Sequence, residues 1–149
     1  MIENLLNRTK TSLSFEVSPP KTEEEFQAVF GKLESFAALK PDFISCTYGA
    51  GGSRAGKTVE IVSYIQNQLH IDAIAHMTCV GFKQADLQTN CEALQREGIR
   101  YVMALRGDRP QAMTDEQFSN REFFYATDMV RYLKANTSLR IAGACYPEK

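Results

Sequence analysis

The sequence has no surplus of charge of either sign, with 17 Lys and Arg against 18 Asp and Glu over 149 residues. A nucleic-acid-binding protein normally shows a basic surplus or stripe, so we expect no nucleic-acid partner. No apolar run approaches the roughly 20 residues that a membrane-spanning helix needs. The first ten residues lack the apolar stretch of ~7–15 residues that is typical of a signal peptide. These absences predict a cytoplasmic protein with no membrane partner.

Metal-binding patterns are absent as well. The four cysteines include no C-x-x-C pair, and the chain has only two histidines. Zinc fingers and ribbons need closely spaced Cys and His ligands, so we expect no metal site. Cys46, Cys79 and Cys145 lie in apolar, strand-like runs. We therefore expect the cysteines to be buried, reduced thiols.

Apolar residues are plentiful, at 44% of the chain, and 9 Phe and 6 Tyr are spread along its length. This composition excludes disordered and coiled-coil proteins and predicts one folded domain with a core. Five nearly continuous apolar runs are typical of strands buried on both faces of a parallel sheet. These runs cover residues 12–17, 42–48, 72–79, 100–105 and 140–146.

Four amphipathic helical patterns lie between these strands. Thr22 and Glu25 have the spacing of a capping box before the first helix, and Gly98 is placed to end the third. Strands that alternate with helices at this spacing predict right-handed βαβ units and a parallel sheet. No Gly/Ser-rich linker divides residues 1–149, and the one long connection, residues 109–120, is expected to be a loop.

Two architectures fit this order, an open doubly wound sheet and a (β/α)8 barrel. Residues 49–54, GAGGSR, miss the last glycine of the dinucleotide fingerprint and follow the second strand. A Rossmann site is therefore not expected. In either architecture ligands bind at the carboxyl ends of the strands, so the polar residues at those ends are the candidate site.

Glu16 and the Arg106-Gly107-Asp108 turn are the strongest candidates at these ends. A carboxylate in an apolar strand either is desolvated, as a general acid is, or caps a loop or pairs with arginine. The Arg106 guanidinium could bind a phosphate, and the Asp108 carboxylate could accept a hydrogen bond from a heterocycle N–H or stabilise a cation. Gly107 between them would let the backbone approach a ligand closely. The alternative is an ordinary turn with solvated charges.

His76 and the glycine-rich segment 49–53 have equally open interpretations. A histidine inside a strand is either a core residue or a functional group. The segment 49–53 precedes a helix whose N-terminal N–H groups suit an anion, but a tight turn with Ser53 as the N-cap explains it too.

Five motifs resemble those of methylenetetrahydrofolate reductases. Residues 15–22, FEVSPPKT, are similar to the FEFFPPKT opening of that family. Four further runs resemble its next motifs in order: TYGAGGS (47–53), AHMTC (75–79), ALRGD (104–108) and ACYPE (144–148). The resemblance covers essentially the whole chain.

The resemblance implies a (β/α)8 TIM barrel that binds FAD and uses NADH or NADPH. The implied reaction reduces 5,10-methylenetetrahydrofolate to 5-methyltetrahydrofolate, which supplies methyl groups for methionine synthesis. Glu16 is implied as the general acid that helps open the folate imidazolidine ring, and Asp108 as the charge beside the flavin and folate rings. The implied FAD-binding residues are Thr47, His76, Arg106, Gly107, Asp108, Tyr125, Ala126, Ala144 and Tyr146.

A barrel of this type takes roughly 250 residues, which is more than this sequence has. We therefore expect residues 1–149 to be the N-terminal part of the barrel, with five of its eight strands. We expect small-molecule partners, folate and nicotinamide, and a homo-oligomer. The alternative is a truncated, non-catalytic module of the same family that binds flavin or another protein.

Overall fold

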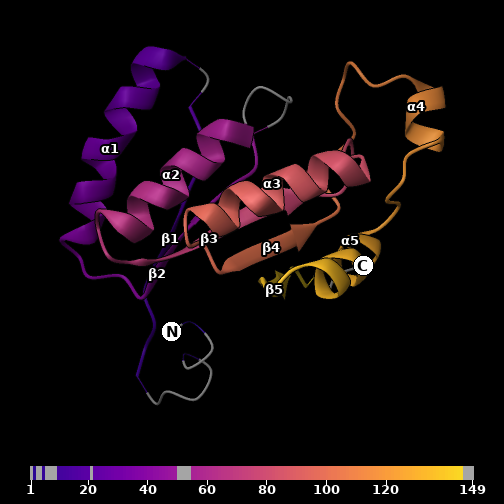
Figure 1. Cartoon of the computed structure of the whole chain (residues 1–149). Helices are drawn as coiled ribbons and strands as arrows, with labels where there is room; N and C mark the ends of the chain where they lie inside the picture. Colours follow the sequence, from indigo (N-terminus) through magenta and orange to yellow (C-terminus); the bar gives the residue numbers. More distant parts are fainter. Residues whose placement is uncertain (1, 3–4, 6–9, 21, 50–54, 146–149) are drawn as a thin grey trace. The chain divides into compact units, whose positions relative to one another are not determined.

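The five strands form one sheet in the order β1-β2-β3-β4-β5 (Figure 1). The computed structural model describes residues 2, 5, 10–20, 22–49 and 55–145. The described pairings β1–β2, β2–β3 and β4–β5 are parallel, as predicted. The strands are β1 (Ser14–Val17), β2 (Phe43–Cys46), β3 (Asp72–Thr78), β4 (Tyr101–Leu105) and β5 (Arg140–Gly143).

The predicted helices are present between these strands, with one addition. They are α1 (Glu23–Ala37), α2 (Ala55–Asn67), α3 (Gln84–Arg96), α4 (Asp115–Ser119) and α5 (Ala126–Asn136). Helix α4 lies inside the connection that was expected to be a loop, so that expectation is wrong over these five residues. A capping box starts this helix: the Thr114 hydroxyl accepts a hydrogen bond from the Gln117 N–H, and the Gln117 side chain accepts one from the Thr114 N–H. The described helices include none with the length and apolarity to span a membrane.

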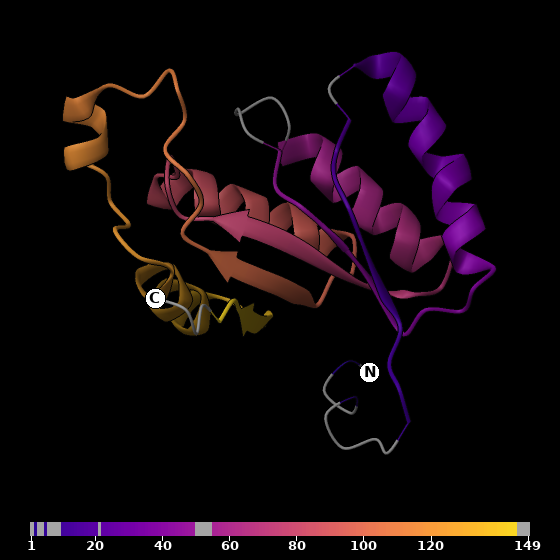
Figure 2. The same cartoon turned by 180° about the vertical axis from the view of Figure 1, so that it is seen from behind.

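The chain forms two compact units, Met1–Ala75 and His76–Lys149. In the first unit, the Thr22 hydroxyl accepts a hydrogen bond of 3.2 Å from the Glu25 N–H, so the predicted N-cap of α1 is confirmed. Phe26, Val29 and Leu33 form the buried stripe of α1. Figures 1 and 2 show β1 beside β2, with which it pairs in register.

Polar contacts join α1 to α2 within the first unit. The Tyr64 hydroxyl donates to the Glu34 carboxylate at 3.0 Å. Lys57 pairs with Glu23 at 2.9 Å, and its ammonium lies 4.8 Å from the centroid of the Phe26 ring. These contacts link two helices that both bury apolar residues, among them Leu33 of α1 and Ile61 of α2.

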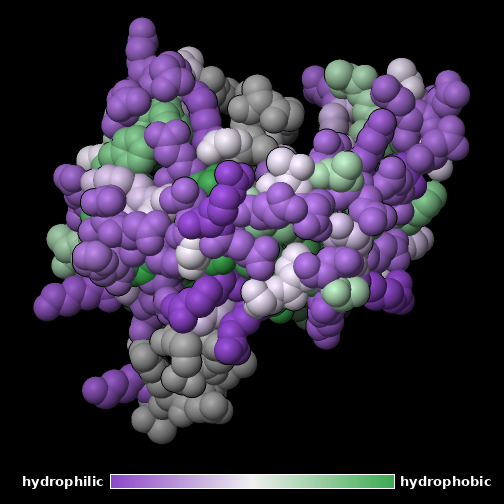
Figure 3. Space-filling model, viewed as in Figure 1, coloured by the Kyte–Doolittle hydropathy of each residue, from purple (hydrophilic) through white to green (hydrophobic). Residues whose placement is uncertain are grey.

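The second unit is built from β4, β5, α3, α4 and α5 with the end of β3. Helix α3 ends before Gly98, whose φ of 73° is the left-handed conformation that a C′ glycine adopts. The Tyr132 hydroxyl of α5 donates to the Gln88 side chain of α3 at 3.0 Å. Met129 and Leu133 are fully buried. Hydrophilic side chains cover the outward surfaces of α2 and α3 in Figure 3, as expected for amphipathic helices.

The cysteine prediction is confirmed at three positions and wrong at the fourth. Cys46, Cys79 and Cys91 are buried free thiols, whereas Cys145 is exposed. The strand predicted over residues 140–146 ends at Gly143, and β5 lies at one end of the strand order. Cys145 therefore follows an edge strand instead of lying inside a buried one.

Leu33 and Leu39 provide a matched test of the first unit's core. Leu33 is fully buried and Leu39 is 60% exposed. We expect Leu33→Ala to lower the free energy of unfolding by about 2–5 kcal/mol, because it removes buried methyl groups and leaves a cavity. Leu39→Ala should change it by less than about 0.5 kcal/mol. Urea denaturation followed by circular dichroism measures both, and equal losses would contradict this core assignment.

Candidate functional site

Glu16 lies on the face of β1 that points away from α1. The ring of Phe15 stacks on Phe36 of α1, with the ring centroids 4.6 Å apart. Side chains alternate along a strand, so Glu16 points to the opposite face. The register pairs Glu16 with Ser45 of β2, which places both residues on that face.

The Glu16 side chain is exposed. Of the two interpretations left open for this carboxylate, the described residues do not show the desolvated one. The cause is its strand, because β1 lies at one end of the strand order and has a neighbour on one side only. Its place at the carboxyl end of a parallel strand is as predicted.

The charge of Glu16 acts on a neighbouring thiol. Burial, and in addition the Glu16 carboxylate, raises the pKa of Cys46 to about 12. A thiol with this pKa stays protonated at neutral pH and is a poor nucleophile. Cys46 is therefore a core residue, and Glu16 is the group with available chemistry at this end of the unit.

Thr47 ties the ends of β1 and β2 together. Its N–H donates to the Val17 carbonyl at 2.8 Å, and its hydroxyl donates to the Ser18 hydroxyl at 2.9 Å. The buried Thr58 hydroxyl of α2 donates to the Thr47 carbonyl at 3.2 Å. These bonds continue the strand pairing beyond Val17 and bring Thr47 and Glu16 to the same edge of the unit. Residues 50–53 of the glycine-rich segment lie outside the described residues.

His76 lies in the second unit and is 5% exposed. Its burial in β3 is what the core interpretation of this residue predicts. By alternation His76 shares a strand face with Thr78, which borders the turn after β4.

Gly107 is held closely against Thr78. Its φ is 76°, and a Cβ on this residue would lie 2.7 Å from the Thr78 Cβ. Only glycine adopts this conformation without strain and leaves room for Thr78. The sequence predicted close approach of a ligand at Gly107, and the structure shows that a neighbouring strand makes such an approach.

The end of β4 is bonded to the segment that follows β3. The Cys79 N–H donates to the Leu105 carbonyl and the Val80 N–H to the Arg106 carbonyl, both at 2.9 Å. The Cys79 thiol also donates to the Arg106 carbonyl at 3.4 Å, and burial is the main cause that raises the pKa of this thiol. The backbone that leads into Gly107 is therefore held by hydrogen bonds, while the side chains of Arg106 and Asp108 are exposed.

Tyr125 and Ala126 lie at the start of α5. Tyr125 is 65% exposed, and Ala126 is the first residue of the helix. The Asp128 carboxylate accepts from the N–H groups of Phe124 and Tyr125, at 3.0 and 2.9 Å, which caps the helix and fixes the backbone at Tyr125. Ala144 is exposed after β5, and Tyr146 lies outside the described residues.

The structure thus groups the candidates by unit. Glu16 and Thr47 lie at the carboxyl ends of neighbouring strands in the first unit. The second unit holds, among the described residues, the other predicted positions: His76, Arg106, Gly107, Asp108, Tyr125, Ala126 and Ala144. No cluster of three or more His, Cys, Asp and Glu side chains forms a metal site in the described parts of the chain.

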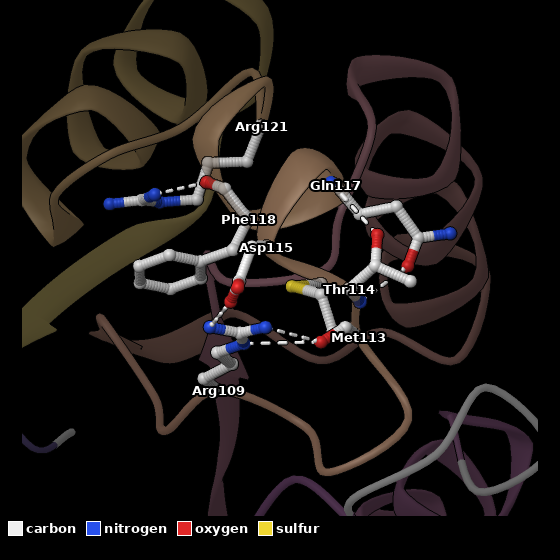
Figure 4. A network of polar contacts seen from close by, with 7 residues as sticks. All are labelled: Arg109, Met113, Thr114, Asp115, Gln117, Phe118 and Arg121. Atoms are coloured by element: carbon white, nitrogen blue, oxygen red, sulfur yellow. Dashed lines mark hydrogen bonds and ion pairs between the residues drawn. The ribbon is translucent and has the colours of Figure 1, made fainter.

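A network of contacts around α4, in the segment after Asp108, was not predicted from the sequence (Figure 4). The Arg109 guanidinium donates to the Met113 carbonyl and pairs with Asp115. The Arg121 guanidinium stacks on the Phe118 ring. The T-x-x-Q spacing of Thr114 and Gln117 is a sequence signal from which the helix could have been predicted. No sequence pattern indicates the contacts of the two arginines.

The family model for methylenetetrahydrofolate reductase matches residues 1–149. The 5,10-methylenetetrahydrofolate reductase of Escherichia coli is 34% identical over 137 residues, which cover 92% of this chain and 44% of that protein. Methylenetetrahydrofolate reductase (NADH) 1 of Zea mays is 34% identical over 99% of this chain and 26% of its own length. The chain therefore spans less than half the length of these relatives.

The fold is similar to that of a solved enzyme. The 4-hydroxy-tetrahydrodipicolinate synthase from Methylacidiphilum fumariolicum SolV superposes with a TM-score of 0.59 at 15% identity. The match covers 94% of this chain and 46% of that one. At this identity the likeness concerns the fold alone. It confirms the predicted α/β class of TIM-barrel type, of which this chain has five parallel strands.

Gly107 yields a test of the turn at the end of β4. We expect Gly107→Ala to destabilise the chain by roughly 2–5 kcal/mol, because the left-handed backbone and the Thr78 side chain both oppose a Cβ. The matched control is Gly31→Ala in α1, where a Cβ meets nothing within 4 Å. That change should stabilise the helix by up to about 1 kcal/mol. Thermal and urea unfolding measure both, and a tolerated Gly107→Ala would refute the steric argument.

Proposed function

The chain belongs to the methylenetetrahydrofolate reductase family, and on this premise we propose that residues 1–149 form the N-terminal part of a flavin-dependent barrel enzyme. The proposed reaction is the reduction of 5,10-methylenetetrahydrofolate to 5-methyltetrahydrofolate by NADH or NADPH. Its product would supply methyl groups for methionine synthesis. The family match over the whole chain is the observation that carries this proposal. We propose a cytoplasmic homo-oligomer with folate and nicotinamide as its small-molecule partners.

The side chains of the second unit have the chemistry that FAD requires. An exposed guanidinium suits a diphosphate, an exposed phenol ring suits an aromatic ring system, and the N-terminus of a helix favours an anion. Arg106, Tyr125 and Ala126 supply these three features. We propose that they hold FAD together with Thr47, His76, Gly107, Asp108, Ala144 and Tyr146. When bound, FAD supplies hydride transfer between nicotinamide and folate.

Glu16 is the proposed general acid. Its carboxyl group would give a proton to the ring nitrogen that leaves as the folate imidazolidine ring opens. The face that carries Glu16 is the one opposite α1, which in a closed barrel is the interior. In such a barrel the Glu16 side chain would lie inside, close to a ligand bound at the strand ends.

Asp108 is proposed to act through its charge. A carboxylate beside the flavin and folate rings stabilises positive charge that develops on the opened folate. The hydrogen-bonded backbone before Gly107, and the close contact of Gly107 with Thr78, would hold this carboxylate in place without a cost in reorganisation. The exposed Asp108 side chain of the described structure is available for that role.

The second candidate is a non-catalytic module that binds flavin or another protein. The observation that favours it is coverage, because the chain spans 44% of the Escherichia coli relative. A visible spectrum of the purified chain separates the two candidates.

We expect the chain to take up FAD, giving absorption near that of bound flavin, to lose that absorption with NADH and to regain it with methylenetetrahydrofolate. Bound flavin that responds to neither substrate would support the non-catalytic flavin module. A chain that stays colourless after incubation with FAD would contradict flavin binding by these residues, and would favour the protein-interaction alternative. Chain unfolded in urea serves as the control for free flavin.

Glu16→Gln tests the acid assignment in the two half-reactions separately. We expect reduction of the flavin by NADH to keep its rate, because that step needs no proton from Glu16. Oxidation of the reduced flavin by methylenetetrahydrofolate should slow by about 10²–10⁴-fold. Stopped-flow absorbance measures both steps, and Glu60→Gln, on the exposed surface of α2, is the matched control. Unchanged folate reduction in the Gln variant would remove Glu16 from this role.

A further inference from the structure

We propose that Arg109 is a positioning residue that preorganises the flavin site, an inference that rests on the proposed function. Arg109 follows Asp108 directly and begins the segment that leads to Tyr125. Both ends of this segment carry proposed FAD-binding residues. A contact that orders the segment therefore fixes both parts of the site at once.

Arg109 closes the first turn of the segment. Its Nε and Nη2 atoms donate to the Met113 carbonyl at 3.1 and 2.7 Å. Its Nη1 atom pairs with the Asp115 carboxylate at 2.6 Å. One guanidinium thus holds a backbone carbonyl and the first residue of α4, which is the forked geometry that arginine provides and lysine does not. We call these contacts the Arg109 clamp.

The clamp is continued by a stack of cationic and aromatic groups. The Arg109 guanidinium lies 5.1 Å from the centroid of the Phe118 ring, and the Arg121 guanidinium lies 3.9 Å from it. Figure 4 shows the Phe118 ring between the two guanidinium groups. Arg121 also donates to the Phe118 carbonyl and lies 4.4 Å from the Phe124 ring. Contacts of this kind run from Arg109 to the residue before Tyr125.

The far end of the segment is anchored on α3. The Glu122 carboxylate accepts a hydrogen bond of 2.7 Å from the Gln84 N–H, at the first residue of α3. This bond satisfies an N–H that has no partner within the helix. The segment is therefore attached to the rest of the second unit at its end, and the Arg109 clamp orders the part between that anchor and Asp108.

This order matters for binding because α4 cannot stabilise itself. A helix of five residues is too short to persist on its own in water, and all residues of α4 are exposed or half-buried. Without the clamp, the segment would be ordered only when FAD binds, and that ordering entropy would weaken the affinity. We expect removal of the clamp to raise the FAD dissociation constant about 5- to 10-fold.

We expect the effect on FAD affinity to come from the two hydrogen bonds to the Met113 carbonyl and from the contact with the Phe118 ring. The ion pair with Asp115 should contribute little. Asp115 is 95% exposed, and an exposed ion pair is screened by water and salt. Asp115→Asn should therefore raise the dissociation constant less than twofold. Arg109→Lys keeps the charge but loses the planar fork, so its effect should lie between those of Asp115→Asn and Arg109→Gln.

The experiment combines FAD titration with hydrogen–deuterium exchange on the 149-residue chain. In Arg109→Gln without FAD, we expect amides of residues 107–125 to exchange about 5- to 10-fold faster, with α3 and α5 unchanged. Arg96→Gln, on the exposed surface of α3, should change neither measurement. A thermal midpoint within about 3 °C of wild type would show that Arg109→Gln leaves the fold intact.

Two results overturn the inference. Unchanged exchange of residues 107–125 in Arg109→Gln would show that the clamp does not order the segment. Faster exchange with unchanged FAD affinity would show that order in the segment does not serve binding. Failure of the wild-type chain to bind FAD at any concentration tested would instead contradict the proposed function, and with it the role of Arg109 in a flavin site, while the exchange data would still report on the clamp itself.

Discussion

The parallel pairing of the strands is the constraint on which the candidate site depends. Parallel strands in register end at the same edge, and alternation along each strand decides which face a side chain reaches. Glu16 is placed by both rules, because Phe15 is stacked on α1 and Glu16 is in register with Ser45. The Thr47 hydroxyl then continues the pairing past the last residue of β1. A shift of one residue would turn the carboxylate toward the helices, so register is also what preserves its chemistry.

In the second unit, Gly107 allows the backbone at the end of β4 to lie close against Thr78. The exposed charges of Arg106 and Asp108 project from a backbone that is bonded on one side to Cys79 and Val80 and pressed on the other against Thr78. A held backbone with the exposed Arg106 guanidinium is what an anion site requires, whereas the Asp108 carboxylate suits a positive charge. This arrangement, the family match and the exposed aromatic ring at the start of α5 support the flavin proposal from independent directions.

Much of the fold was predictable because its signals are local. Apolar runs marked all five strands, and the Thr22 cap and the glycine after α3 followed from short-range hydrogen bonding. Strand ends were less predictable, since pairing decides where a strand stops, and Cys145 shows the consequence. The prediction of a loop before α5 was wrong over Asp115–Ser119, where the Thr114 capping box starts a short helix. The contacts of Arg109 had no sequence signal, because its partners depend on how the chain turns.

The class of fold, the order of the elements, the family motifs and the polar residues at the strand ends could all be recognised in the amino-acid sequence alone. These features depend on residue type and spacing, which are properties of the sequence before the chain folds. The tertiary structure decided three matters that spacing does not contain. Glu16 is exposed because β1 is an edge strand, Gly107 is required because Thr78 touches it, and the segment after Asp108 is ordered by arginine contacts. Each depends on which neighbours a residue meets in space, and only folding brings those neighbours together.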